Sequence, residues 1–140
     1  MHVFDLSQED FERKRDNFAK TNVMNRFALL FRMNLTDPNR QPSPTEMKRY
    51  MADWNAWISG MDAADQLADG GDHFAPAGRV LSSGNTVEDG PYKADDLSVA
   101  GFILVWAADL DHATEIAAQC PILAGAHTSV EIRETALPGA

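Results

Sequence analysis

The stretch of the chain best suited to chemistry is the polar turn at residues 86–92, between two apolar runs. Within it, Asp89-Gly90-Pro91 puts a carboxylate beside one flexible and one rigid backbone joint. Gly90 adopts positive φ at little cost, while Pro91 fixes its own φ and disfavours helix at Gly90. A turn of this kind can hold an acid in one direction, so Asp89 is a candidate general base or water-orienting group. The alternative is a plain hairpin turn whose carboxylate bonds the turn backbone.

A catalytic Asp89 needs a raised pKa, and burial beside large apolar side chains would supply one. Trp54 and Trp57 suit that role, because they belong to an expected helix whose apolar face is mainly Met and Trp. Such side chains fit either an irregular core against a sheet or the wall of a ligand pocket. With Tyr92 and Trp106, they are candidate ligand-binding residues.

Two histidines complete the candidate ligand-binding set. His73 ends the acidic segment 69–73, and His127 begins the last expected strand. Each could act as an acid or base near neutral pH, or be structural. Adjacent loop residues seldom converge on one ion, so no metal site is predicted. Cys120 is the only cysteine, which excludes an internal disulfide and favours a buried, inert thiol.

The charged residues and the composition limit the partners. Arg26, Arg32 and Arg79 flank expected strands and could anchor a carboxylate or form surface ion pairs. The 140 residues carry a net charge of −9, which disfavours nucleic acid and anionic membranes as partners on electrostatic grounds. The N-terminus lacks the pattern of a signal peptide, and with a single cysteine a cytoplasmic location is the simplest expectation. No glycine-rich phosphate loop precedes a helix, and no cofactor is predicted.

The elements that must position these groups follow the order strand, helix, two strand pieces, strand, helix, strand. Ser43, Pro44 and Glu46 signal the start of the first helix, which is expected to stop at Gly70-Gly71. Asp109 caps the second helix. The expected strands are 26–33, 79–81 with 86–88, 97–106 and 127–134, and the helices are 44 to 65–69 and 110–119.

This order is that of a ferredoxin-like βαββαβ α+β sandwich, with both helices on one face of a four-stranded antiparallel sheet. Residues 26–33 and 99–106 are apolar on both sides, so a monomer would expose the second sheet face. A homodimer with sheets packed face to face would cover it. Residues 1–22 are expected to form an N-terminal helical extension, residues 23–134 the domain and residues 135–140 a tail.

Several short motifs together resemble a known family. They are Gly78-Arg79-Val80-Leu81, Asp89-Gly90-Pro91-Tyr92, Gly101-Phe102, Asp109-Leu110-Asp111-His112-Ala113, Cys120-Pro121-Ile122-Leu123 and Val130-Glu131-Ile132-Arg133. Their order and spacing over about residues 26–134 are similar to the YCII-related family, in particular to its branch named for an Asp-Gly-Pro-Phe (DGPF) motif. Tyr92 stands where that motif often has Phe.

The resemblance implies a dimeric α/β barrel on a ferredoxin-like fold, in a family whose members mostly lack an assigned reaction. Some members are thought to use a His–Asp pair in a cleft between the first helix and the sheet. Asp89 matches the acid, but residues 47–67 contain no histidine. The function expected is a homodimer that binds an unknown small organic molecule, with a candidate acid/base site at Asp89. The alternatives are a non-catalytic ligand-binding or accessory module, and a cofactor-free monooxygenase-like barrel protein.

Overall fold

The computed structural model describes residues 24–136. In chain order its elements are β1 (Asn25–Met33), the 3-10 turn η1 (Pro38–Arg40), α2 (Pro44–Ala63), β2 (Leu67–His73), β3 (Arg79–Ser82), β4 (Thr86–Asp89), β5 (Ser98–Ala107), α3 (Leu110–Ala117), the 3-10 turn η2 (Pro121–Ala124) and β6 (Ser129–Glu134). The helical extension expected within residues 1–22 and the end of the expected tail lie outside the described residues.

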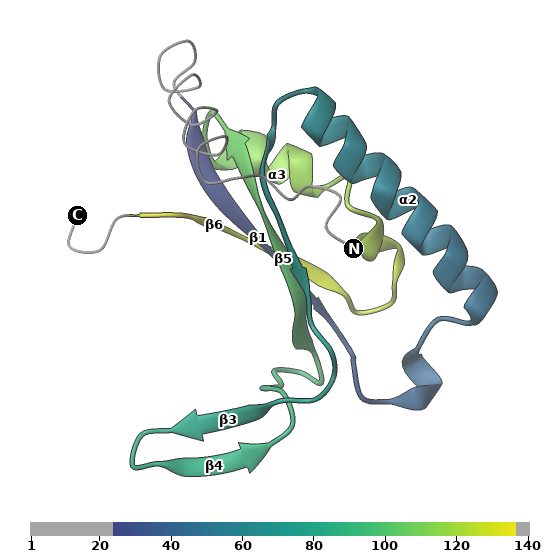
Figure 1. Ribbon diagram of the computed structural model, residues 1–140, viewed down its shortest axis with the longest axis vertical. Helices are drawn as coiled ribbons and strands as arrows, with labels where there is room; N and C mark the ends of the chain where they lie inside the picture. Colours follow the sequence, from purple (N-terminus) through teal and green to yellow (C-terminus); the bar gives the residue numbers. More distant parts are fainter. Residues whose placement is uncertain (1–23, 137–140) are drawn as a thin grey trace.

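Four strands form one antiparallel sheet in the order β2-β5-β1-β6. α2 and α3 lie together on one face of this sheet (Figure 1). Each β-α-β half contributes one central and one edge strand, namely β1 and β2 from the first half, and β5 and β6 from the second. The ferredoxin-like α+β arrangement expected from the sequence is therefore confirmed.

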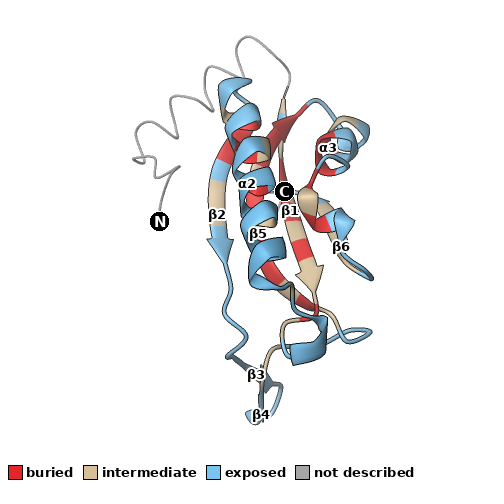
Figure 2. Ribbon diagram, turned by 90° about the vertical axis from the view of Figure 1, so that its right-hand side faces the viewer, coloured by how far each residue is buried: buried red, intermediate tan, exposed pale blue. Residues whose placement is uncertain are grey.

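The core lies between the sheet and the two helices. Leu29 of β1 stands opposite Ile103 of β5, and Phe27 stands opposite Val105. Because paired residues of antiparallel strands point to the same face, these four fully buried side chains form one apolar layer. The helices cover that layer with their own buried residues, which are Trp54, Ile58, Met61, Ala113, Ile116 and Ala117 (Figure 2).

Both helices begin where the sequence predicts. Ser43 Oγ accepts a hydrogen bond from the Glu46 backbone N–H at 3.1 Å, and the Glu46 carboxylate accepts one from the Ser43 N–H at 3.0 Å. This is a complete capping box, with Pro44 in the first turn. At α3, Asp109 Oδ1 accepts from the His112 N–H at 2.8 Å. Both helix starts are thus capped by side chains within three residues in the chain.

The end of α2 and the second strand of the sheet differ from the prediction. α2 ends at Ala63, Asp65 adopts a φ of 56°, and Leu67–His73 is strand β2. The sequence predicts continued helix and a connector here, because Asp and Gly are poor strand formers. The strand exists because Leu67 and its neighbour Ala68 are buried and because the segment pairs with β5.

Two glycines allow β2 to approach β5 closely. Gly71 has a φ of +60°, and a Cβ at that position would lie 1.7 Å from the Phe102 carbonyl oxygen. A Cβ at Gly101 would lie 2.5 Å from the Asp72 carbonyl oxygen. The register shifts twice along this pair, as in a bulged strand. The missing side chains at Gly71 and Gly101 are thus what lets the two backbones come this close.

The segments expected to supply the second strand instead pair with each other as the hairpin β3–β4, a separate two-stranded sheet. Gly84 and Asn85 turn the hairpin with φ values of 84° and 65°. Figure 1 shows the hairpin projecting beyond the end of the main sheet, toward the side away from α2 and α3. It is thus an insertion between β2 and β5 rather than part of the main sheet.

Candidate functional site

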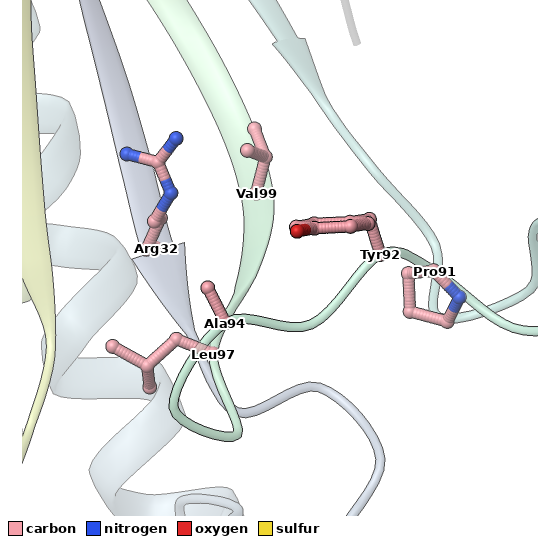
Figure 3. A pocket seen from close by; sticks show the side chains of 6 residues that line it. All are labelled: Arg32, Pro91, Tyr92, Ala94, Leu97 and Val99. Carbon is pink, nitrogen blue, oxygen red and sulfur yellow. The ribbon is translucent and has the colours of Figure 1, made fainter. Parts of the chain in front are cut away.

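A pocket of about 240 Å³ lies beside the sheet face that faces away from α2 and α3, here called the outer face. Its lining residues come from β1, from β5 and from the loop between β4 and β5, and are Arg32, Pro91, Tyr92, Ala94, Leu97 and Val99 (Figure 3). Arg32 pairs with Val99 across the two central strands. Since the neighbouring Phe31 points into the core, alternation directs Arg32 to the outer face.

Hydrogen bonds hold the loop wall of the pocket in place. Ala94 and Leu97 exchange backbone hydrogen bonds of 2.9 and 3.0 Å. The turn between them is tight, with φ values of 53° and 64° at Asp95 and Asp96. The buried Asn34 side chain donates to the Asp96 carbonyl at 3.0 Å, which ties this turn to the end of β1. Ala94 and Leu97 therefore present a fixed apolar surface beside Arg32.

Arg32 takes part in an ion-pair network on the outer face. Its Nη1 atom lies 2.6 Å from Oε1 of Glu131 on β6, and Nη1 of Arg133 lies 3.3 Å from Oε2 of the same carboxylate. The hydrogen bond from Arg32 is the main cause that lowers the pKa of the Glu131 carboxyl, and Arg133 adds to it. With both guanidinium groups protonated, the three side chains carry a net charge of about +1.

Tyr92 forms the wall across from Arg32. Figure 3 shows its ring reaching in beside Val99, with Arg32 on the far side of that residue. Tyr92 is 73% exposed, so its ring can adjust to a ligand at little cost. The chain leaves β4 through Gly90, whose φ is 92° and whose N–H donates to the Gly78 carbonyl at 2.7 Å. Of the candidate ligand-binding residues, Tyr92 is the one that lines this pocket.

Asp89 lies at the end of β4 and is not part of the pocket lining. Its Oδ1 accepts a hydrogen bond at 3.1 Å from Nε of Arg79, its partner across the hairpin. The two side chains are largely exposed, Asp89 by 90% and Arg79 by 76%. Burial beside Trp54 or Trp57, on which a catalytic role depends, is not present in the single chain. An acid/base role for Asp89 stays a prediction.

Trp54 and His73 meet in an aromatic cluster on the helix-covered face of the sheet. Their ring centroids are 5.3 Å apart, and Trp54 also lies 4.9 Å from Phe31 and 5.4 Å from Trp57. Trp54 is 6% exposed and belongs to the hydrophobic core, whereas Trp57 is half-buried against it. The sheet separates this cluster from the pocket, so a ligand-binding role for the three residues stays a prediction.

Trp106 and His127 lie elsewhere. Trp106 is buried on β5 and pairs in register with Arg26, which directs it to the outer face. His127 is exposed in the turn before β6, with a φ of 60°. Neither residue lines the pocket. The structure therefore does not gather the predicted site residues into one place.

Arg32 is a candidate carboxylate anchor from the sequence, but its place in a site is evident only from the fold. The sequence feature that marks Arg32 is its charge, which stands near the end of an otherwise apolar expected strand. Ala94, Leu97 and Val99 also line the pocket but are not among the candidates from the sequence. They carry no such signal, because only the folded loop brings them beside Arg32.

Two general features of the described part of the chain bear on function. Within residues 24–136, no three His, Cys, Asp or Glu side chains are grouped so that they could hold a metal ion. No helix in the same range has the length and apolar character needed to cross a membrane.

The fold and the pocket define the class of protein: a ferredoxin-like α+β domain with an inserted hairpin and a small open pocket beside its outer sheet face. The chain matches the YCII-related domain over residues 37–136, more than half of its length. The protein therefore belongs to the YCII-related family. No curated protein sequence matches it significantly.

Proposed function

We propose that the protein is a homodimer that binds a small organic molecule in the pocket between Arg32 and Tyr92. The observation that carries this proposal is that the pocket opens beside a sheet face with an apolar centre. On that face, Leu30 stands opposite Phe102 and Ala28 opposite Leu104, and all four side chains are only half-buried. A second copy that packed the same face against these residues would remove them from water.

The hairpin β3–β4 supports the same arrangement. A two-stranded hairpin on its own is marginally stable in water, and this one exposes an apolar pair, Leu81 opposite Val87. These side chains are 66% and 57% exposed. Because the hairpin projects toward the side of the outer face, a copy docked on that face would also meet the hairpin (Figure 1).

This arrangement is consistent with either of two roles for Asp89. An acid/base role requires that the partner cover the hairpin, because the carboxylate is exposed in the single chain. The second candidate function, a ligand-binding module without catalysis, is favoured by the ion pair between Asp89 and Arg79, which already occupies the carboxylate.

Light scattering on the full chain at micromolar concentration tests the dimer. We expect twice the monomer mass, and we expect Leu30→Glu to shift the protein to monomer because it places charges at the centre of the contact. Met47→Glu is the matched control, since Met47 is exposed on α2, away from the outer face. A wild-type monomer at this concentration, with a native circular dichroism spectrum, would refute the dimer.

Binding of small aromatic molecules, followed by NMR shifts of the Arg32 and Tyr92 side chains, tests the ligand site. We expect shifts at these residues and none at Leu123, which is exposed on η2 behind the sheet. Shifts confined to the Trp54 cluster would place the ligand on the other face and contradict the proposed pocket.

A further inference from the structure

The pocket joins one oriented cation to an apolar wall. Arg32 contributes the only charged side chain of the lining, and Glu131 is its ion-pair partner among residues 24–136. That contact engages Nη1, which leaves other N–H groups of the planar guanidinium able to donate. A guanidinium whose plane is already held can bind a planar anion through two parallel hydrogen bonds.

The surrounding charge favours an anion of low charge. Arg32, Glu131 and Arg133 together leave about one positive charge, and the acidic Asp95 and Asp96 are exposed and do not line the pocket. The chain as a whole carries −9, which disfavours multiply charged anions. Phosphate groups are commonly bound at helix N-termini, but strands and a loop line this pocket. These features favour a singly charged carboxylate over a phosphate group.

The size and shape of the pocket limit the rest of the ligand. Its volume of about 240 Å³ is smaller than a site for a drug-sized molecule, which starts near 300 Å³. The apolar surface comes from Leu97 and Val99, and the Tyr92 ring lies beside Val99 (Figure 3). A single ring or a compact branched group fits between such walls.

We infer that the pocket binds a small monocarboxylate with a flat or compact apolar body, its carboxylate on Arg32 and its body against Val99 and Tyr92. Glu131 tunes the affinity, because the ligand must share Arg32 with a carboxylate that is already bound there. This inference rests on the proposed ligand site and names its ligand class.

Calorimetric titration of the full chain with benzoate and with benzamide, its neutral counterpart, tests the inference. We expect benzoate to bind at least about tenfold more tightly, because only benzoate gains charge-assisted hydrogen bonds. Glu131→Gln keeps the shape of the side chain but removes the competing charge, so benzoate affinity should rise by about tenfold while benzamide affinity stays unchanged.

Two further variants serve as reference points. Arg32→Lys keeps the charge but removes the planar fork, so benzoate affinity should fall several-fold. Arg49 is exposed on α2, on the other side of the sheet, so Arg49→Gln makes the same change in net charge away from the pocket and should alter benzoate affinity by less than about threefold. Native circular dichroism spectra and melting curves show that each variant is folded.

The outcomes separate this inference from the proposed function. Equal affinities for benzoate and benzamide, both reduced by Tyr92→Ala, would overturn the carboxylate assignment and leave the ligand site standing. If the protein were a dimer but did not bind benzoate, the carboxylate inference would also be overturned. A monomer that prefers benzoate and tightens in Glu131→Gln would support the inference and refute only the dimer.

Discussion

Arg79 and Asp89 face each other at the base of the β3–β4 hairpin, with Nε of the arginine 3.1 Å from Oδ1 of the aspartate. The carboxylate of the Asp89-Gly90-Pro91 turn is thus engaged by a cation of its own hairpin. Because both groups are exposed, their attraction is screened by water and salt. The pair orients the carboxylate without desolvating it.

Asp89→Asn should therefore change the free energy of unfolding by less than about 1 kcal/mol, the usual limit for an exposed ion pair. Urea unfolding followed by circular dichroism gives the value, and Arg79→Gln should show a similar loss. A loss near 3 kcal/mol, by contrast, would indicate a buried charge pair, which in this protein requires that a partner cover the hairpin.

Gly71→Ala should destabilise the protein by at least about 3 kcal/mol, since the new Cβ would overlap the Phe102 carbonyl and the residue has positive φ. Gly60→Ala is the matched control, because this glycine is in the body of α2 and a Cβ there would meet no neighbouring side chain or strand within 4 Å. It should instead stabilise the protein by up to about 1 kcal/mol through helix propensity. Urea midpoints compare the two. If Gly71→Ala were neutral, the close β2–β5 approach would be wrong.

Trp54→Ala should cost about 3–5 kcal/mol of unfolding free energy, as expected when a large aromatic side chain is removed from a core. Tyr92→Ala is the comparison, because this aromatic side chain is 73% exposed and should cost less than about 1 kcal/mol. Thermal and urea unfolding measure both. A small cost at Trp54 would indicate that its ring faces an open cavity, as a pocket-wall role requires.

Stability should fall as the pH rises from about 9 to about 12. Burial raises the pKa of the Cys120 thiol from 9.0 to about 12, and burial, assisted by Cys120, raises the pKa of the Tyr50 hydroxyl from 10.0 to about 12. In this range the unfolded chain releases protons that the folded chain keeps, which favours unfolding. Below pH 9 both states hold these protons, and the stability contribution of the two groups is fully present.

Urea midpoints at pH 8 and pH 10.5 measure this effect, and Cys120→Ala should reduce the difference between them. The same burial should make the thiol react with a disulfide reagent at pH 8 far more slowly in the native protein than in urea. Fast reaction of the native thiol would contradict the burial of Cys120.

Much of the fold could be predicted because its signals are local. The Ser43–Glu46 capping box and the Asp109 cap set helix starts through contacts within a few residues, and the apolar runs of β1 and β5 mark central strands. Strand β2 could not be predicted this way, because its Asp- and Gly-rich segment gains strand structure only from pairing with β5. The two hairpin segments carry strand signals of their own, but those signals do not name a partner, and the segments pair with each other rather than with the main sheet.

The linear chain is enough to establish most of the order of elements, the helix caps, the acidic net charge and the motifs of the YCII-related family. Which side chains share a site became apparent only in the folded protein. Folding places Asp89 on Arg79, His73 on Trp54, and Arg32 across a pocket from Tyr92. Helix caps and apolar periodicity can be read from the sequence because they act over a few residues. A pocket is built by contacts between segments that are distant in the chain, and the direction of each side chain there follows from sheet register and loop path.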